Sequence, residues 1–307
     1  MIRFLLTRIF HIALSLLVVI VFVFFLSRLT GDPATLMLST EATKEQVQAL
    51  RTSLGLDRPL IEQLYIYLKG VVTRGDFGLS FRYKEPALLL VATRGIPTAE
   101  LTLFSLLIAI VIGVPAGIIA GLRPGRWMDM GTQSFALLGQ SAPTFWLGLM
   151  LIQVFAVSLR WFPVMGGGGF SHLILPAITL GLPTAALIGR MLRSSVLEVK
   201  NEDYVRTARA KGLPEVVVVF MHIIRNALIP VVTVIMLQMG YLMGGAVVTE
   251  TVFNYPGMGL LAIQSIYGRD YVVVQAFVVV AAAIIMFLNL IADLIYLILD
   301  PRLKYDH

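Results

Sequence analysis

Long runs of apolar residues alternate with shorter polar segments along the chain. The apolar runs lie at about Ile9–Ser27, Pro97–Ala120, Gln133–Leu159, Leu173–Leu192, Leu228–Val248 and Val272–Leu299. An α-helix rises about 1.5 Å per residue, so about twenty apolar residues cross the roughly 30 Å hydrocarbon core of a bilayer. The pattern therefore predicts an all-α polytopic membrane protein with about six transmembrane helices.

Composition supports a lipid environment and excludes several classes of protein. Apolar residues make up 58% of the 307 residues and charged residues 14%, with a mean hydropathy of +0.86. The net charge is +6, but the basic residues lie between the apolar runs and do not form a basic patch, so we expect no nucleic-acid binding. The chain has no cysteine and four dispersed histidines, so neither a thiolate site nor a histidine metal cluster is expected, and we expect no cofactor in this chain.

The first apolar run follows Arg3 and Arg8 and has the outline of a secretion signal. A cleaved signal peptide is one interpretation. The run is long for such a peptide, however, and the residues after it, Arg28 to Pro33, contain no small-x-small cleavage site. We therefore expect residues 1–28 to form a short tail and an uncleaved first transmembrane helix.

Residues 29–95 are polar and carry the signals of short helices. Thr43 and Gln46 form a capping-box pattern, and Gly55 is placed to end the helix that follows. A second amphipathic helix is expected from Pro59. One side of this second helix carries apolar residues at Leu60, Ile61, Leu64, Tyr65 and Leu68. This segment is predicted to be a small helical cap against the membrane.

Lysine and arginine near the ends of apolar runs predict the orientation, because short loops rich in these residues stay in the cytoplasm. One side of the membrane holds Arg3, Arg8, Arg123, Arg126, seven basic residues between Arg190 and Arg225, Arg302 and Lys304. The short loops of the other side hold only Arg160 and Arg269. Both termini are therefore expected in the cytoplasm, and the cap is expected on the extracytoplasmic side.

Residues 96–307 are predicted to form a core of five transmembrane helices. The cytoplasmic loop at residues 194–226 of this core contains residues that typically begin and end short helices. Asn201 can cap a short helix, Gly212 suits the left-handed position that ends it, and Pro214 suits the first turn of another helix. Two short cytoplasmic helices that meet at a corner are therefore predicted. An ordinary basic loop on the inner side of the membrane is the alternative.

The runs Asp203–Leu213 and His222–Val234 resemble the cytoplasmic EAA loop of the permease subunits of bacterial ATP-binding-cassette (ABC) importers. The resemblance is to the branch that takes up dipeptides, oligopeptides, nickel and glutathione. Further landmarks of this branch follow in order along nearly the whole chain, at residues 31–33, 54–59, 75–80, 175–177, 253–259 and 300–302. The resemblance implies the type I ABC importer permease fold.

In that family the EAA loop forms a coupling helix that docks on a cytoplasmic ATPase. The resemblance assigns ATPase coupling to Asp203, Tyr204, Arg206, Thr207, Ala208, Ala210, Lys211, Gly212 and Leu213. Ala208 is expected to permit close approach and Gly212 to make the turn. This chain has Arg206 and Thr207 where the general pattern has glutamate and alanine, so a glutamate contact to the ATPase is not expected.

Polar and aromatic residues of the fifth and sixth apolar runs are candidates for a pathway or gate. These candidates are Gln238, Tyr241, Glu250, Phe253, Tyr255, Pro256 and Asp293. Charged groups are costly in lipid, so Glu250, Asn289 and Asp293 should face protein or water. Holding helices together is the alternative role. Gly240, Gly244 and Gly245 are candidates for close helix contacts, either in a dimer or within the bundle.

The segment Phe253–Gly259 contains a proline and two glycines, which predict a turn after the fifth helix. An ordinary loop is the alternative. The family resemblance implies a short outer helix here that borders the translocation path.

Two other classes of protein are alternatives to an importer subunit. An intramembrane enzyme is suggested by Gly139-Gln140-Ser141-Ala142, but no histidine is expected at the depth of Ser141 to act as its base. An ion-coupled secondary transporter or channel requires paired membrane carboxylates or repeated halves, which the sequence does not show. None of the six lysines is followed by serine or threonine, so the chain lacks a P-loop and ATP hydrolysis must come from partners.

The resemblance thus implies a permease subunit in a bacterial inner membrane. Its expected partners are a second, similar permease chain that forms a heterodimer, two ATP-binding subunits that hold ATP and magnesium, and an extracytoplasmic substrate-binding protein. Peptide is the first expectation for the substrate, and nickel or glutathione is the alternative.

Overall fold

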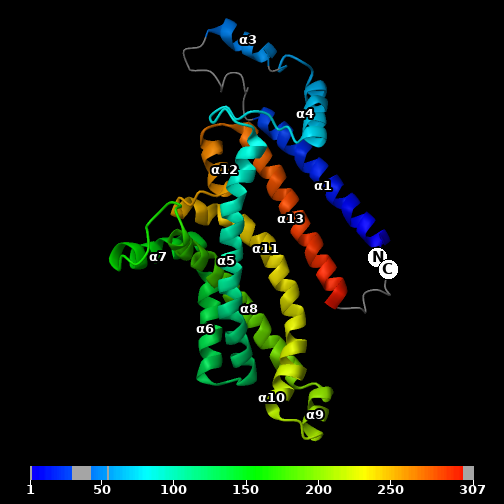
Figure 1. Ribbon diagram of the computed structural model, residues 1–307, viewed down its shortest axis with the longest axis vertical. Helices are drawn as coiled ribbons and strands as arrows, with labels where there is room; N and C mark the ends of the chain where they lie inside the picture. Colours follow the sequence, from blue (N-terminus) through cyan, green and yellow to red (C-terminus); the bar gives the residue numbers. More distant parts are fainter. Residues whose placement is uncertain (1, 30–42, 54, 300–307) are drawn as a thin grey trace. The chain divides into compact units, whose positions relative to one another are not determined.

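The computed structural model describes residues 2–29, 43–53 and 55–299, and the regular elements in these residues are helices apart from one isolated bridge between Leu79 and Pro86 (Figure 1). In chain order they are α1 (Ile2–Leu29), α3 (Lys44–Ser53), α4 (Leu60–Arg74), α5 (Ala87–Leu122), α6 (Trp127–Ser141), α7 (Thr144–Leu151), the π-helix η1 (Ile152–Ser158), α8 (Phe170–Lys200), α9 (Asp203–Ala210), α10 (Glu215–Val217), the π-helix η2 (Val218–Ile224), α11 (Arg225–Phe253), α12 (Met258–Tyr267) and α13 (Tyr271–Leu299). The landmarks at residues 31–33 and 300–302 lie outside the described residues.

Five of the described helices are long and apolar enough to cross a membrane, and the number rises to six when a bent pair of helices is counted as one span. The expected all-α polytopic fold is therefore confirmed. The five spans include α1, α5, α8, the continuous run from α10 to α11, and α13.

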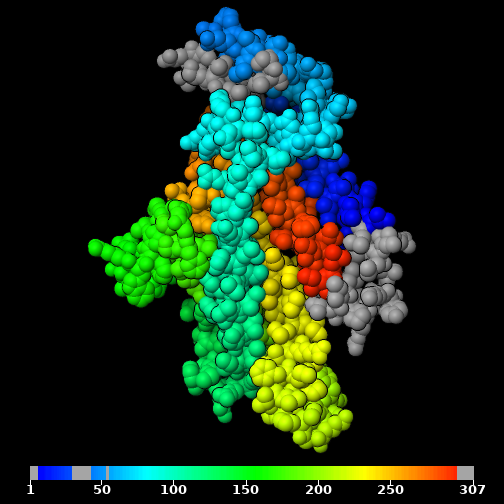
Figure 2. All heavy atoms as spheres, viewed as in Figure 1, coloured from blue at the N-terminus to red at the C-terminus, as the bar shows by residue number. Residues whose placement is uncertain are grey.

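The apolar run at Gln133–Leu159, which was predicted as one span, is divided in the structure. The chain breaks between Ser141 and Thr144, and the pair of helices on either side is bent by 105°. Pro143 causes the break, because it has no amide hydrogen for the Gly139 carbonyl and it forces the preceding Ala142 into an extended conformation with ψ 126°. The segment that contains α7 and η1 projects to one side in the space-filling view, although α7 itself packs against α8 and α11 (Figure 2).

The described residues divide into two compact units. Unit 1 comprises Met1–Pro97 and Gly257–Met286, and unit 2 comprises Thr98–Pro256 and Phe287–His307.

Unit 1 joins the helices before residue 97 to α12 and the first half of α13. Its core contains Ile20 of α1, Val91 of α5, and Val273 with Ala276 of α13. Tyr67 of α4 stacks on Phe24 of α1 with their ring centroids 5.5 Å apart. This aromatic contact attaches the cap helix α4 to the first transmembrane helix.

The predicted cap helices are present. Thr43 and Gln46 exchange two hydrogen bonds, of 3.0 Å and 3.3 Å, which confirms the capping box. On the apolar side of α4, Leu68 packs into unit 1 together with the adjacent Tyr67. Ile61 and Tyr65 on the same side are 80% and 64% exposed.

Unit 2 is organised around α8, which packs against α6, α7 and α11. In the most apolar stretch of α8, 67% of the residues are buried, against 33% in α5 and in the α10–α11 span. A helix buried to this extent is surrounded by protein on most sides. The positions of α6 and α11 are therefore both set by their contacts with α8.

Small residues allow α5 and α8 to lie with their backbones in contact. Gly113, Gly117 and Gly121 follow each other at intervals of four on α5. A Cβ atom added to Gly113 or Gly117 would lie 2.6 Å from a carbonyl oxygen of α8, that of Ala185 or Gly189. Spacing of this kind is a known device for close packing of membrane helices. Gly240, Gly244 and Gly245 of α11 were the glycines predicted for close contacts; within this chain a Cβ at Gly244 would meet nothing within 4 Å, and one at Gly245 would lie 3.5 Å from Leu180.

Candidate functional site

The segment between α8 and α11 places α9 at a sharp corner of the chain. The prediction that Asn201 caps α9 was wrong, because Asn201 closes α8 by donating from Nδ2 to the Leu197 carbonyl at 3.0 Å. Glu202, in an extended conformation, precedes the first residue of α9. The corner therefore begins with a fixed end of α8.

The two faces of α9 have different environments. Val205 is fully buried and Ala208 is 5% exposed, and both belong to the core of unit 2. Asp203 and Arg206, whose side chains are 96% and 70% exposed, form an ion pair of 3.4 Å on the opposite face. The expectation that Ala208 lies open for close approach by a partner is corrected by this burial. The outer face offers instead the exposed residues Asp203, Tyr204, Arg206, Thr207, Ala210, Lys211, Gly212 and Leu213.

Gly212 ends α9 in the left-handed conformation, with φ +74°, as its position in the sequence predicted. Its amide donates to the Arg209 carbonyl at 2.9 Å, and Pro214 then starts the next helix by accepting from the amides of Val217 and Val218. The second helix is not a separate short one, because α10 continues through η2 into α11. Movement of α9 can therefore be passed directly to a transmembrane helix.

A two-point ion pair spans this corner. Nη2 and Nε of Arg209 donate to the two carboxylate oxygens of Glu215 at 2.9 Å and 3.2 Å. The Glu215 carboxylate raises the pKa of the Arg209 guanidinium above its usual range, so this arginine stays charged. Partial burial, with the nearby charge of Glu202, raises the pKa of the Tyr204 phenol, so this residue stays neutral at ordinary pH. The outer surface of the corner thus combines charged groups with one neutral phenol.

Four of the predicted pathway or gate residues come together at the end of α11. Glu250 is fully buried and accepts a 2.6 Å hydrogen bond from the Thr98 hydroxyl. Phe253 and Tyr255 are also buried, and the Tyr255 amide donates to the Glu250 carbonyl at 2.8 Å. Burial, with the charges of Glu100 and Glu250, raises the pKa of the Tyr255 phenol. These residues support a turn, and they do not face solvent in this conformation.

The turn itself has the geometry that Phe253–Gly259 predicted. Asn254 adopts φ +47°, and α12 begins after Gly257. The glycine-rich loop before α8 docks onto this turn, with the Gly166 amide donating to the Phe253 carbonyl at 2.9 Å. A Cβ atom at Gly167 would lie 2.5 Å from Pro256, so only glycine permits this contact. Pro256 therefore joins the turn to the preceding loop.

The remaining pathway candidates lie elsewhere. Tyr241 is 70% exposed on α11, and Gln238 is half-buried about one turn before it. Asp293 lies half-buried on α13, and Asn289 is exposed. The structure thus separates the predicted set into a buried turn and individual side chains along two helices.

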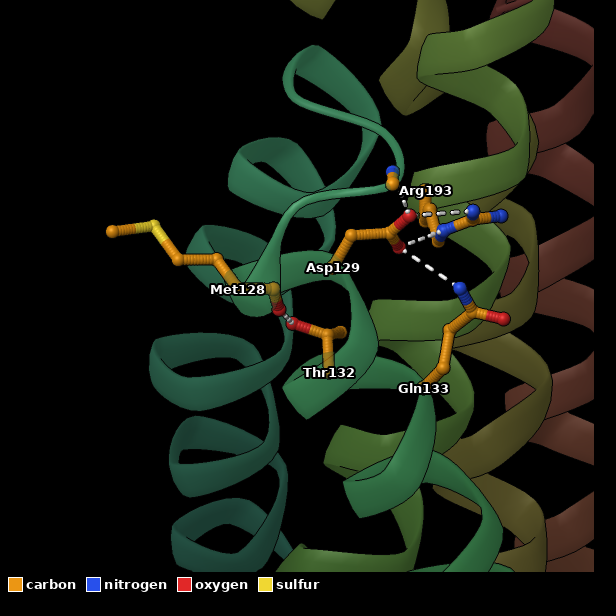
Figure 3. A network of polar contacts seen from close by, with 6 residues as sticks. Met128, Asp129, Thr132, Gln133 and Arg193 are labelled. Carbon is orange, nitrogen blue, oxygen red and sulfur yellow. Dashed lines mark hydrogen bonds and ion pairs between the residues drawn. The ribbon is translucent and has the colours of Figure 1, made fainter.

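An ion pair that was not predicted from the sequence joins α6 to α8. Figure 3 shows the Asp129 carboxylate between the Arg193 guanidinium and the Gln133 amide. Asp129 also accepts a 2.8 Å hydrogen bond from the Gly125 amide, and it is 2% exposed. Asp129 lies just before the third apolar run, and Arg193 lies just after the fourth. These two ends are expected on the same side of the membrane, so the opposite charges were a signal from which the pair could have been predicted.

Comparison with known proteins identifies the class of this chain. The family described as Binding-protein-dependent transport system inner membrane component matches residues 113–305, and the N-terminal region described for such membrane components matches residues 1–95. The chain belongs to this family and is a permease subunit of an ABC importer.

Close relatives match over the full length. The glutathione transport system permease proteins GsiC of Escherichia coli and of Shigella dysenteriae are each 42% identical over 306 residues, which is 99% of this chain and 100% of theirs. Among solved structures, a chain of the MetNI methionine ABC transporter in an inward-facing conformation has a TM-score of 0.59 at 21% identity, covering 68% of this chain and 96% of that one. A chain of an amino acid ABC transporter has a TM-score of 0.54 at 14% identity, covering 68% and 93%. These two structures confirm the type I permease fold.

Membership of this family has three direct consequences. The chain is a multi-pass component of an inner membrane, and it is not an enzyme. ATP hydrolysis takes place in partner subunits. Transport depends on a binding protein, as the description of the family states.

Proposed function

We propose that this permease imports short peptides of the glutathione type. Full-length relatives at 42% identity are named as glutathione transport permeases, and this observation carries the proposal. Glutathione was the alternative to a dipeptide or oligopeptide in the expectation from the sequence. Because glutathione is itself a small peptide, the proposed substrate is a compact, polar member of the peptide class.

The face of α9 formed by Asp203, Tyr204, Arg206 and Lys211 is proposed to dock on the ATPase. Exposure of these residues supports this role, because the opposite side of the helix is anchored by Val205 and Ala208. A helix held on one side by its own core can transmit a displacement as a rigid element. Gly212 and the Arg209–Glu215 pair then connect the displacement to α11.

The proposed assembly pairs this chain with a second, similar permease and two ATP-binding subunits that hold ATP and magnesium. Both termini and α9 lie in the cytoplasm in this proposal, and the 29–95 cap lies outside. The excess of basic residues in the loops on the side of α9 supports this orientation.

The substrate can be tested on the assembled complex in proteoliposomes with its binding protein. ATP-dependent uptake of labelled glutathione should exceed that of a labelled dipeptide or of nickel ions. Equal or greater stimulation of ATP hydrolysis by nickel would contradict the proposal. Uptake that persists without ATP but follows an imposed ion gradient would contradict the coupling mechanism as well.

A matched pair of variants tests docking. Arg206→Glu reverses an exposed charge on the outer face of α9, whereas Arg126→Glu reverses an exposed charge outside this face, in the turn before α6. ATPase should co-purify poorly with the first variant and normally with the second. Equal recovery of the ATPase with both variants would exclude this face as the docking surface.

A further inference from the structure

One exposed flank of α6 carries four polar residues around the apolar Leu137, which is 65% exposed, although the helix is part of the bent pair that is long and apolar enough to cross a membrane. Gln133, Ser134, Gln140 and Ser141 are all exposed, and their spacing places them with Leu137 along one side of the helix. Ser134, Gln140 and Ser141 make no side-chain hydrogen bond to another residue in the described part of the chain. This flank therefore presents free amide and hydroxyl groups.

The neighbouring span α5 exposes apolar side chains instead. Its exposed side chains within the apolar run include Leu103, Leu107, Val111 and Ile119, and they are 43% to 62% exposed. Burying an amide or hydroxyl in hydrocarbon without a partner costs several kcal/mol, on the order of 4–8 for transfer to an alkane. The polar flank of α6 is thus suited to contact with water or polar groups and not with lipid chains.

Gln140 and Ser141 lie at the end of α6 that is remote from the basic residues before it. Gln140 lies 13 residues after Trp127, the first residue of α6, which corresponds to about 20 Å along the axis. The hydrocarbon core is about 30 Å thick, so for a helix that enters the bilayer upright at Trp127 the last turn lies inside this core.

The break after Ser141 adds backbone groups to the same place. Ala142 is extended and Pro143 cannot donate, so the last carbonyls of α6 and the first amides of α7 have no helical partners. Non-helical backbone at membrane depth is tolerated where it is enclosed by protein or lines a water-filled cavity. Broken helices of this kind commonly form substrate sites in transporters.

We propose that the α6 flank Gln133–Ser141 and the break at Ala142–Pro143 line the water-filled translocation path and bind main-chain amide groups of the peptide substrate. The proposal rests on the proposed function, because it assumes a peptide-like ligand. The flank carries no charge of its own, and its amides and hydroxyls can donate and accept hydrogen bonds. Such a surface recognises the peptide unit and is tolerant of different side chains.

The absence of cysteine from the natural sequence makes a direct test possible. Gln140→Cys and Ser141→Cys should react with a membrane-impermeant, charged thiol reagent in the assembled transporter. Leu107→Cys and Val111→Cys on α5 are the controls, and they should react only with a lipophilic maleimide. S-Methylglutathione, which has no thiol and cannot exchange with the introduced cysteine, should slow labelling at position 140 when it is supplied with the binding protein.

Each alternative has its own outcome. Labelling of positions 140 and 141 by the lipophilic reagent alone would show that this flank faces lipid and would overturn the proposal. Protection from both reagents in every nucleotide state would show that the second permease covers the flank, which also overturns it.

A transport measurement separates this inference from the proposed function. Gln140→Leu should raise the glutathione concentration needed for half-maximal uptake several-fold, and the ATPase subunits should still co-purify with the variant. An unchanged concentration dependence, with normal uptake by the wild-type complex, would refute substrate binding by the flank alone. Failure of the wild-type complex to take up glutathione would instead refute the proposed substrate.

Discussion

Arg193 on α8 holds both carboxylate oxygens of Asp129 on α6, and the two residues are 64 positions apart in the sequence. Asp129 is 2% exposed and Arg193 is 20% exposed, so the pair is largely removed from solvent. Planar guanidinium and carboxylate groups matched at two points are the most directional of the common ion pairs. The pair therefore fixes the rotation of α6 against α8 at the start of the broken span.

Removal of one partner of this pair should be strongly destabilising. Asp129→Asn leaves the arginine charge buried, and breaking a buried pair in this way costs about 3–5 kcal/mol. Thermal unfolding of the purified protein should show a lower midpoint for this variant. The double variant Asp129→Asn with Arg193→Gln should lose less stability than the sum of the two single changes. Additive losses would indicate that the two groups do not interact.

The contact between α5 and α8 predicts a large difference between two glycines. Gly117→Ala places a methyl group 2.6 Å from the Gly189 carbonyl oxygen and 2.9 Å from the Leu192 side chain, so the helices must separate. Overpacking of this kind costs about 1–3 kcal/mol. Gly131→Ala in α6 is the matched control, because its methyl group would meet nothing within 4 Å. Alanine should leave stability there unchanged or raise it by up to about 1 kcal/mol.

The ion pair between Arg209 and Glu215 should be needed for coupling between ATP hydrolysis and transport. Exchange of the two charges should therefore restore the coupling that reversal of either single charge reduces. The Arg209–Glu215 pair is 36% and 62% exposed, so it contributes at most about 1 kcal/mol to stability. Arg209→Glu and Glu215→Arg should each lower the substrate transported per ATP hydrolysed, with little change in thermal unfolding. The double swap should recover the ratio. A ratio that stays low in the swap would mean that the arginine itself contacts the ATPase.

A buried carboxylate at the start of α13 bonds to the segment at residues 75–86 of the cap. Asp270 is 1% exposed and accepts hydrogen bonds from the Ser80 hydroxyl and, at 3.2 Å, from the Arg82 amide. Asp270→Ala leaves both donors without their partner, so the segment at residues 75–86 should open more often. Hydrogen exchange of its amides should accelerate as a result. Asp76→Asn is the control, since an exposed asparagine can still accept from the Gly78 amide.

Only part of the candidate site could be anticipated from the sequence. The conformation of Gly212 and the turn at Asn254–Gly257 follow from local steric preferences, which a short stretch of sequence contains. Which side of α9 is buried depends on the helices around Val205 and Ala208. Likewise, the sequence showed that Glu250 needed a polar environment, but Thr98 lies 152 positions away.

The sequence by itself determined the class of protein, the approximate number of apolar spans and the capping box at Thr43 and Gln46. These properties depend on hydrophobic length and on contacts between residues three or four apart. Tertiary structure alone decided that α6 pairs with α8 through Asp129 and Arg193, that Gly117 meets Gly189, and that a polar flank of α6 stays open beside the break at Pro143. The physical reason is that backbone contact, ion pairing and exposure depend on residues brought together by the packing of helices distant in sequence.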